Sequence, residues 1–258
     1  IGVAMGGRGT DVAKEAASVV LQDDRFETVG AAIEEGRVVF DNIRRFVFYL
    51  FSCNVAEVAV LLGAGLSGMP LPLMPLQILW LNIVTDTLPA LALALEPAGA
   101  GVMRRPPRPP REALVTGRLT RALLGYAALI AAVSLAAFGW ALRTTGDATQ
   151  AATVAFMTLG LAQILHLGNA RSDRHVLSRR RAVANRYALA GAGAAAAMQL
   201  LPLAVPALAR TLDLRPLDGG TWLVVVALAA VPAVAGQLVK LLAEWMPHAR
   251  RQSAAGVS

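Results

Sequence analysis

Six long apolar runs dominate this chain of 258 residues and restrict the folds that are open to it. As a helix, each run is long enough to cross the ~30 Å hydrocarbon core of a bilayer. Hydrophobic residues make up 56% of the chain and charged residues only 16%, against about 25% charged residues in an average soluble protein. We therefore expect a mainly α fold, a six-helix transmembrane bundle in an integral membrane protein. The six runs are residues 46–66, 72–95, 122–142, 152–170, 187–208 and 221–243.

The residues before the first apolar run have a different pattern. Short apolar stretches at Ile1–Met5 and Val19–Leu21 are typical of strands, and Thr10 can cap a short helix between them. This order of strand, helix and strand indicates the end of an α/β domain. A helical pattern then begins at Phe26 and continues without a stop signal into the first run. The sequence thus predicts four parts: the C-terminal end of a cytoplasmic domain (1–25), a stalk helix (26–45), six spans (46–245) and a cytoplasmic tail (246–258).

The chain starts at Ile1, with no initiator methionine and no basic leader. Because this start resembles the middle of a strand, we expect the chain to be a fragment of a longer protein. Soon after it, residues 6–9 form a glycine-rich turn before a helix. Such a turn can hold a phosphate group through backbone N–H groups, or it can be a plain connection between a strand and a helix. A glycine-rich turn alone is weak evidence for a site, so we favour the plain turn.

The net charge of +7 comes almost entirely from arginine. A basic chain can bind nucleic acid or an anionic membrane, and here the arginines cluster between the apolar runs. We therefore expect membrane lipid, and no nucleic acid, as a partner. Arginine is enriched in cytoplasmic loops, which predicts that both ends of the chain and its two basic loops are cytoplasmic. The basic residues are Arg104, Arg105, Arg108, Arg111, Arg118 and Arg121 after the second run, and Arg171, Arg174, Arg179, Arg180, Arg181 and Arg186 after the fourth.

Two carboxylates, Glu57 and Asp86, lie within the apolar runs. Ionisable groups are costly in the hydrocarbon, so they indicate function there. By their spacing, Asn54 and Glu57 share one face of the first helix, and Asn82, Thr85 and Asp86 share one face of the second. Because a short loop joins these two helices, we expect both sets of side chains at a similar depth in the bundle.

Together these five oxygen-bearing side chains predict a site for a hard cation such as Ca²⁺, Na⁺, K⁺ or Mg²⁺, with Glu57 and Asp86 as its charged metal ligands. Pro89 has no N–H, so it leaves the carbonyl of Thr85 free as a further ligand. Gln163, in the fourth run, is a candidate for an additional ligand. The alternative interpretation of the whole cluster is hydrogen bonding between helices.

Other residues carry weaker signals. His166, in the fourth run, either extends the cation site or bonds a neighbouring helix, and Asn169, near the end of that run, is expected at the membrane interface. Cys53 points away from the face of the candidate ligands, so we expect a buried and inert thiol. The stretch 190–197 is rich in alanine and glycine, which predicts close packing between helices.

Four stretches resemble the P-type cation-transporting ATPases, in the branch of the sarcoplasmic-reticulum calcium pump and its bacterial relatives. Ile1–Leu21 looks like the segment after that family's GDGxNDxPAL motif, and Gly36–Arg45 (GRVVFDNIRR) is similar to the stalk of its fifth transmembrane helix. Ser52–Val58 (SCNVAEV) resembles the cation-site motif of that helix. Gln77–Pro89 (QILWLNIVTDTLP), with the later loop EPAGAGVMRRPPRPPREAL, resembles the sixth helix and its following loop. The likeness is strong over residues 1–115 and diffuse beyond.

The resemblance implies that residues 1–25 end a haloacid-dehalogenase-like phosphorylation domain. Gln163 aligns with a glutamate in the eighth helix of the two-site calcium pump, which predicts a site for one Ca²⁺ rather than two. Cys53 stands where serine is usual in the family. The ligands that the resemblance implies for the transported ion are Asn54, Glu57, Asn82, Thr85 and Asp86.

The implied function is that of the C-terminal membrane part of an ATP-driven pump in a bacterial plasma membrane, which exports Ca²⁺ by alternating access and returns protons. The sequence contains neither the DKTG motif nor the TGE motif of the family. ATP and Mg²⁺ are therefore expected to bind the N-terminal part of the same pump, which is the implied partner. Alternatives within the family are Na⁺, K⁺ and H⁺ pumps, although Asn82 argues against the sodium–potassium type, which has an aspartate there. A six-span passive channel or secondary transporter is the alternative from another class.

Overall fold

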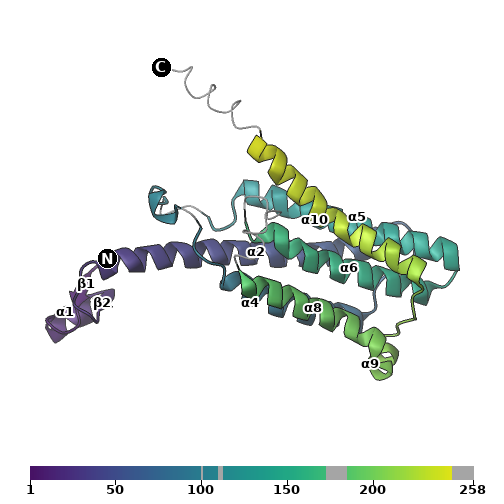
Figure 1. The fold of residues 1–258 in the computed structure, drawn as a ribbon, viewed down its shortest axis with the longest axis horizontal. Helices are drawn as coiled ribbons and strands as arrows, with labels where there is room; N and C mark the ends of the chain where they lie inside the picture. The colour runs from purple at the N-terminus through teal and green to yellow at the C-terminus, as the bar shows by residue number, and fades with distance from the viewer. Residues whose placement is uncertain (100, 110–112, 173–184, 246–258) are drawn as a thin grey trace, which may run out of the picture. The chain divides into compact units, whose positions relative to one another are not determined.

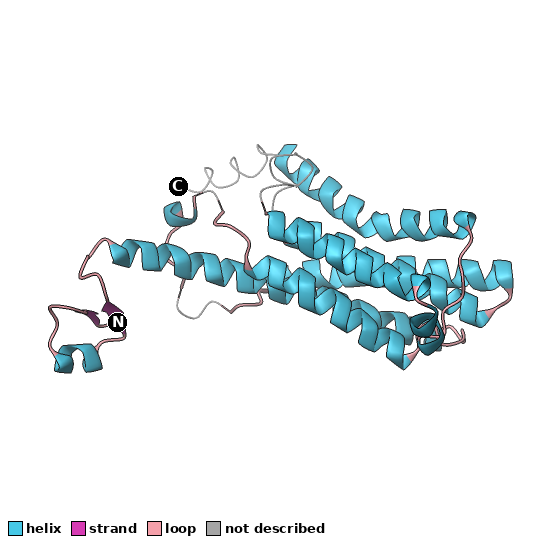
Figure 2. Cartoon of the chain, turned by 60° about the horizontal axis from the view of Figure 1, so that its bottom comes forward, coloured by secondary structure: helices cyan, strands magenta, loops and turns pink. Residues whose placement is uncertain are grey.

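The computed structural model describes residues 1–99, 101–109, 113–172 and 185–245, and most of them are helical (Figure 2). The chain divides into two compact units, one of residues 1–42 and 97–112 and the other of residues 43–96 and 113–258. Six helices in the described residues are long and apolar enough to cross a membrane, which confirms the prediction of a mainly α chain with six spans. These helices are Thr28–Leu66, Pro75–Ala94, Gly117–Thr145, Ala148–Ala170, Arg186–Ala204 and Gly219–Glu244.

The N-terminal part contains a strand, a short helix and a second strand, as predicted. Strands β1 (Val3–Met5) and β2 (Val19–Leu21) pair in parallel, with helix α1 (Asp11–Ala16) between them in the chain. The hydroxyl of Thr10 accepts a hydrogen bond from the N–H of Ala13, which confirms the predicted helix cap. The assignment of this part to a phosphorylation domain stays a prediction.

The glycine-rich turn at residues 6–9 already holds an anion of the chain itself. The backbone N–H groups of Gly7 and Arg8 donate to the two carboxylate oxygens of Asp24, at 2.7 and 2.9 Å. A Cβ at Gly9 would come within 2.2 Å of the Met5 carbonyl oxygen, so the close approach of the backbone requires glycine there. Because its N–H groups are occupied, the turn is structural, and the plain-turn interpretation is the one that the contacts support.

The predicted stalk and the first predicted span form one uninterrupted helix. Helix α2 (Thr28–Leu66) begins two residues later than the expected start at Phe26, because the preceding residues form a turn. In this turn the Asp23 carboxylate accepts hydrogen bonds from the Thr28 hydroxyl and the Arg25 N–H, which lower the pKa of Asp23 below its usual value. At 1.5 Å per residue, α2 is about 58 Å long. One helix therefore contains both the predicted stalk and the first predicted span.

The basic loop at residues 97–109 is held to the stalk by its own arginines and by one from α2. Arg37 donates to two carbonyl oxygens of the loop, at 2.8 and 2.9 Å. From the loop, Arg105 pairs with Asp41 at 2.9 Å, and the guanidinium of Arg108 lies 3.0 Å from the ring centroid of Phe40. A short 3₁₀ turn, η2 (Val102–Arg104), lies within the loop. These arginines therefore have structural contacts besides the topological role that the sequence predicts for them.

The second span differs from the regular helix predicted for residues 72–95. It consists of α3 (Pro75–Leu81), a five-residue π-helix η1 (Asn82–Asp86) and α4 (Thr87–Ala94). Pro89 lies just beyond η1 and has no N–H to bond one turn back. In a π-helix the backbone hydrogen bonds reach five residues instead of four, and such turns occur often at functional sites. The sequence predicted an interrupted backbone hydrogen bond before Pro89, and in the structure the backbone there is irregular because it forms a wider, π-helical turn.

The core of the larger unit surrounds α6 (Ala148–Ala170). In its most apolar window 83% of the residues are buried within the protein, against 22% in α8 (Arg186–Ala204) and 28% in α10 (Gly219–Trp245). Helices α5 (Gly117–Thr145) and α10 (Gly219–Trp245) pack along one side of α6, and α8 lies on the side of α4 (Figure 1). Most side chains on α6 are therefore buried against protein, whereas the outer helices leave larger apolar faces for lipid.

The fifth predicted span, 187–208, is divided in the structure. Helix α8 (Arg186–Ala204) ends at Val205, which has extended backbone angles, and α9 (Pro206–Thr211) follows. The residue before a proline avoids the α conformation because the proline ring clashes with it. Pro206 thus ends the span four residues earlier than the sequence analysis expected.

The alanine- and glycine-rich stretch of α8 packs closely, as predicted. A Cβ at Gly191 would lie 3.1 Å from the carbonyl oxygen of Leu88 and 3.1 Å from the Cβ of Ala92. Glycine thus lets the backbones of α8 and α4 approach each other.

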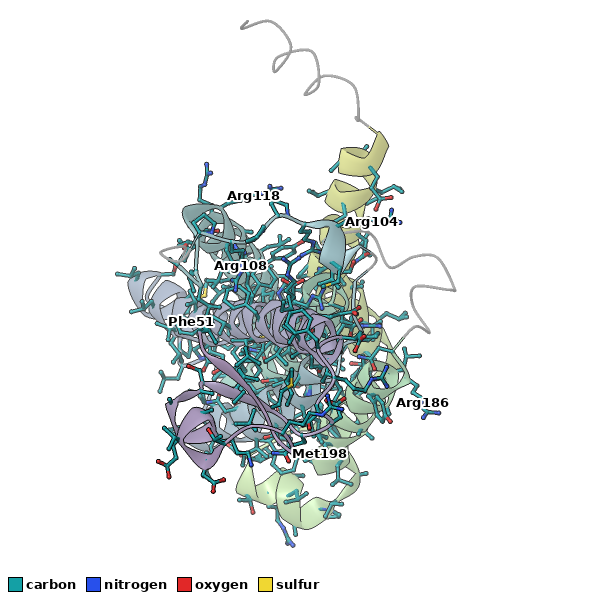
Figure 3. All side chains as sticks on the ribbon, turned by 90° about the vertical axis from the view of Figure 1, so that its left-hand side faces the viewer. Phe51, Arg104, Arg108, Arg118, Arg186 and Met198 are labelled. Atoms are coloured by element: carbon teal, nitrogen blue, oxygen red, sulfur yellow. The ribbon has the colours of Figure 1, made fainter. Side chains whose placement is uncertain are left out.

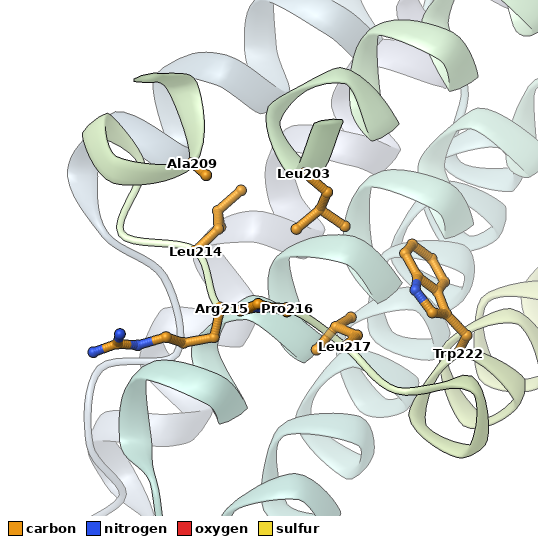
Figure 4. Close-up of a pocket in the computed structure, with 7 residues that line it drawn as sticks. All are labelled: Leu203, Ala209, Leu214, Arg215, Pro216, Leu217 and Trp222. Carbon is orange, nitrogen blue, oxygen red and sulfur yellow. The ribbon is translucent and has the colours of Figure 1, made fainter. Parts of the chain in front are cut away.

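A cavity of about 260 Å³ lies near α9, where α8 and α10 are joined (Figure 4). Its lining is mostly apolar and includes no carboxylate. This cavity therefore does not have the ligands of a cation site. The lining residues are Leu203, Ala209, Leu214, Arg215, Pro216, Leu217 and Trp222.

Helices α5 and α8 begin at the same end of the larger unit, so Arg118 and Arg186 lie at the end that faces the viewer in Figure 3. Both residues are exposed. This common location agrees with the prediction that the two basic loops share one side of the membrane, while the assignment of that side to the cytoplasm stays a prediction. The predicted tail 246–258 and part of the predicted basic loops lie outside the described residues: Arg111, Arg174, Arg179, Arg180 and Arg181.

Candidate functional site

Glu57 lies inside the bundle and is held by a side chain of the central helix. It projects from α2, and only 4% of its surface is exposed. The amide nitrogen Nε2 of Gln163, on α6, donates to Oε1 of Glu57 at 3.0 Å and to the carbonyl oxygen of Cys53 at 3.3 Å. Gln163 thus lies next to a predicted ligand. Cys53 is fully buried, as expected.

Asp86 joins the π-helix to α2. The Nδ2 group of Asn54 donates to Oδ2 of Asp86 at 3.3 Å and also to the carbonyl oxygen of Leu50 at 2.9 Å. The hydroxyl of Thr85 lies 2.9 Å from the Leu81 carbonyl oxygen and 3.3 Å from Oδ1 of Asp86. The hydrogen bond from Asn54 to Asp86 therefore connects the two sets of residues predicted from helix spacing, one on α2 and one on η1.

Neither of the two carboxylates, Glu57 and Asp86, forms an ion pair within the described ranges of the chain. Two bare carboxylates in a low-dielectric bundle are strongly disfavoured. The geometry thus favours either a bound cation or bound protons at this position.

Two amide oxygens of the candidate site are free to accept. Oδ1 of Asn82 and Oε1 of Gln163 are both buried and have no hydrogen-bond donor among the residues that the structure describes. A buried acceptor without a donor costs free energy, and a bound ion or water molecule commonly satisfies such an acceptor. Asn82 lies on the same π-helix as Thr85 and Asp86.

The donor set suits a hard cation. Carboxylate, amide and hydroxyl oxygens are the ligands that Ca²⁺ prefers. No group of three or more His, Cys, Asp or Glu residues that could hold a metal was found in the described part of the chain. A site of the zinc type, which needs nitrogen or sulfur ligands, is therefore absent from those residues.

His166 lies near the candidate site but has no hydrogen bond to it. It is fully buried among aromatic rings, with ring centroids 4.6 Å from Tyr126, 5.6 Å from Phe48 and 6.1 Å from Tyr49. Neither ring nitrogen has a hydrogen-bond partner in the described parts of the chain. Of the two roles that the sequence leaves open, the structure thus supports neither a contact with a candidate ligand nor a bond to a neighbouring helix.

Asn169 is buried, contrary to the expectation that it lies at the interface. Only 4% of its surface is exposed, and it bonds the Pro232 carbonyl and the Gln237 amide of α10 at 3.0 and 2.6 Å. The sequence shows that Asn169 is near the end of a span, but it does not show that α10 covers that end.

A buried ionic cluster that the sequence did not predict lies at the end of the second span. Arg171 was assigned to a basic loop, but it is 5% exposed and pairs with Glu96 at the end of the second span. The sequence did contain one indication of this ion pair, because Glu96 is the first carboxylate after the apolar run that contains Asp86.

Comparisons with known proteins agree with this arrangement. Residues 70–242 match the family model described as "Cation transporting ATPase, C-terminus". The chain is 40% identical over 242 residues to a "Calcium-transporting ATPase" of Bacillus subtilis, an alignment that covers 93% of this chain and 27% of the relative. It is 40% identical over 229 residues to a "Probable cation-transporting ATPase F" of Mycobacterium tuberculosis, covering 89% of this chain and 25% of the relative. The chain thus spans about a quarter of the length of the curated relatives that it matches.

Proposed function

The chain belongs to the P-type cation-transporting ATPases, as part of their C-terminal membrane region, and we propose that it carries the ion site of a pump that exports Ca²⁺. This proposal is supported by two carboxylates, Glu57 and Asp86, that form no ion pair among the described residues, and by two buried amide oxygens that have no donor there. Oxygen ligands suit Ca²⁺, and the named calcium-transporting relatives favour it among the hard cations. Relatives named only for cation transport keep Na⁺, K⁺ and H⁺ as alternatives.

Alternating access follows from the way in which α2 meets the second span. Asn54 and Glu57 belong to the helix that continues from the stalk, whereas Asn82, Thr85 and Asp86 belong to a π-helix in another element. A displacement of the stalk changes the separation of the two sets and so weakens a cation site shared between them. Protons then neutralise Glu57 and Asp86 during the return step, because bare carboxylates are costly there.

The energy source lies outside these residues. The sequence contains no DKTG motif and no TGE motif, so its residues do not fit the phosphorylation and nucleotide sites of the family. ATP and Mg²⁺ are therefore assigned to the N-terminal part of the same pump, which is the proposed partner of this chain. Both ends of the chain are proposed to face the cytoplasm across a bacterial plasma membrane, from the distribution of arginine.

The proposed stoichiometry is one Ca²⁺ per cycle. Calcium takes six to eight oxygen ligands. The candidate site offers two carboxylates, two amides and one hydroxyl, and residue 163 is a neutral glutamine. These groups belong to Glu57 and Asp86, to Asn54 and Asn82, and to Thr85. A second ion would add two positive charges without a matching carboxylate, which a low-dielectric site disfavours.

The test is transport by the full-length pump in sealed vesicles. We expect uptake of ⁴⁵Ca that depends on ATP, and loss of that uptake in Asp86→Asn. Thr87→Ser, at the exposed neighbouring position, is the matched control and should keep normal uptake. Uptake driven equally well without ATP would support a channel or secondary transporter, and ATP-dependent uptake of Na⁺ or K⁺ but not Ca²⁺ would assign a different ion.

A further inference from the structure

Three helix ends meet at a buried ionic cluster, on the side of the bundle where α5 and α8 begin. Glu96 follows α4 by two residues, Arg171 directly follows α6, and Asn185 directly precedes α8. Arg171 donates to both carboxylate oxygens of Glu96, from Nε at 3.1 Å and from Nη2 at 3.2 Å. The two side chains are only 6% and 10% exposed. We call Glu96, Arg171 and Asn185 the three-helix junction.

Asn185 joins the end of α4 to the start of α8 through one amide group. Its Nδ2 donates to Oε2 of Glu96 at 2.7 Å and to the Ala92 carbonyl oxygen, in the last turn of α4, at 3.2 Å. Its Oδ1 accepts from the N–H of Ala188 at 3.0 Å and so caps the start of α8. The end of α4 and the start of α8 are therefore fixed to each other by hydrogen bonds at their backbones.

The chemistry of the junction indicates that it orients the three helices more than it stabilises the fold. A buried ion pair is costly to desolvate, and replacing such a pair with apolar residues is often neutral or stabilising. A guanidinium that bonds both oxygens of a carboxylate, however, defines orientation as well as distance. The junction thus specifies how α4, α6 and α8 are arranged, which apolar packing alone specifies less strictly.

Two of the elements that the junction connects, the second span and α6, carry Asp86 and Gln163 of the candidate ion site. Asp86 lies ten residues before Glu96, about 15 Å along the second span, and Gln163 lies eight residues before Arg171, about 12 Å along α6. The hydrogen bonds among Glu96, Arg171 and Asn185 connect the ends of α4, α6 and α8, whereas Asn54 and Glu57 of the candidate site lie on α2. A shift of α4 along α6 would therefore move Asp86 relative to Gln163.

We propose that the three-helix junction is a positioning device for ion binding: it fixes α4 against α6 and α8, so that Asp86 and Gln163 keep the separation that the cation requires while α2 moves. Glu96, Arg171 and Asn185 are positioning residues, because none of them touches the ion. The role in ion binding rests on the proposed function, whereas the coupling of the three residues to one another does not.

The test uses Glu96→Gln, Arg171→Gln and the double variant in the full-length pump. The readout is the Ca²⁺ concentration that gives half-maximal phosphorylation from ATP. Residues that orient metal ligands typically change metal affinity 10- to 100-fold, so we expect each single variant to raise this concentration about tenfold or more. The double variant should be no worse than the worse single variant, because the three residues act as a unit. Arg186→Gln, at the exposed arginine beside Asn185, is the matched control and should behave as the unmodified pump.

Two further measurements separate positioning from mere folding. Asn185→Ser keeps a side chain that can cap α8 but removes both hydrogen bonds donated by the amide, so we expect a smaller shift in the same direction. Phosphorylation by inorganic phosphate without Ca²⁺ tests whether each variant is folded. The proposal is wrong if folded variants keep the normal half-maximal Ca²⁺ concentration, even with a lower thermal midpoint, or if Arg186→Gln shifts it equally. Failure of the proposed function is a different result: the unmodified pump would then show no Ca²⁺-dependent phosphorylation.

Discussion

The two carboxylates of the candidate ion site lie in contrasting backbone environments. Glu57 is on an uninterrupted helix of 39 residues, and an amide of the central helix holds it. Asp86 is the last residue of a five-residue π-helix, is more exposed, and among the described side chains bonds Asn54 and its own neighbour Thr85. One charge thus belongs to a regular helix that continues to the stalk, and the other to a locally irregular segment.

This difference assigns different tasks to the two residues. A regular helix transmits axial movement, so Glu57 follows the stalk. A π-helix is less regular in its hydrogen bonding, so the backbone at Asp86 can adjust around an ion at a low cost. We therefore expect the cation to depend most on Asp86 for charge, and the coupling to the stalk to depend on the α2 side. The following experiments examine that division.

The largest effect is expected from Asp86→Asn in the full-length pump. It should abolish Ca²⁺-dependent phosphorylation from ATP, because a neutral amide compensates the charge of a hard cation poorly. Phosphorylation by inorganic phosphate without Ca²⁺ should survive and serves as the folding control. Normal Ca²⁺ dependence in this variant would show that the candidate site is not the ion site.

Glu57→Gln should have a strong but smaller effect, raising the Ca²⁺ concentration for half-maximal phosphorylation on the order of 100-fold through loss of a charged ligand. The effect is smaller because the glutamine oxygen still accepts the hydrogen bond from Gln163, so the local geometry is kept. Val58→Ala, at the exposed adjacent position, is the control. If Glu57→Gln were more severe than Asp86→Asn, the order of the two carboxylates would be reversed.

Pro89→Ala tests the π-helix itself. Restoring an N–H at residue 89 favours a regular α-helix through residues 82–86 and so turns Asp86 away from Asn54. We expect a loss of Ca²⁺ affinity of roughly tenfold, typical of changes just outside a metal site. The control is Pro202→Ala, which removes a proline from the interior of α8, a helix that carries no candidate ligand. Equal affinities in both variants would mean that the irregular backbone does not matter for the ion.

The smallest effect concerns Gln163, which contacts the regular side of the site. Equilibrium binding of ⁴⁵Ca to the full-length pump, normalised to phosphorylatable sites, should give a ratio near one. Gln163→Glu adds a carboxylate beside Glu57, so a second and weaker binding event is expected at high Ca²⁺. Gln237→Glu, at another buried glutamine, controls for added charge in the bundle. A ratio near two with positive cooperativity in the unmodified pump would refute the one-ion prediction.

The candidate ligands could be chosen from sequence because residues at their spacing share a face both in an α-helix and in a π-helix. Asn82 and Asp86 are four residues apart, which is about one turn in an α-helix and also in a π-helix. The π-helix itself was not predictable, since Pro89 indicates a broken hydrogen bond but not how the backbone adapts. Pro206 was the missed signal in the fifth span, where hydropathy alone extended the helix too far.

Burial of polar residues near span ends was the least predictable feature. Asn169 and Arg171 follow one another closely at the end of α6, a position that usually faces the interface or solvent. In the structure α10 covers the first and the residues around Glu96 and Asn185 cover the second. Spacing along one chain does not reveal which distant segment covers a helix end.

The sequence by itself determined that this chain is mainly helical with six spans, because hydropathy is a sum over local residues and does not depend on their neighbours in space. It also determined which oxygen-bearing side chains lie in those spans. Only the tertiary structure decided that Gln163 bonds Glu57, that Asn54 bonds Asp86, and that three helix ends meet at Glu96. These are pairings between distant segments. They depend on how whole helices pack, and the polar groups inside an apolar bundle then bond to whatever partners that packing places beside them.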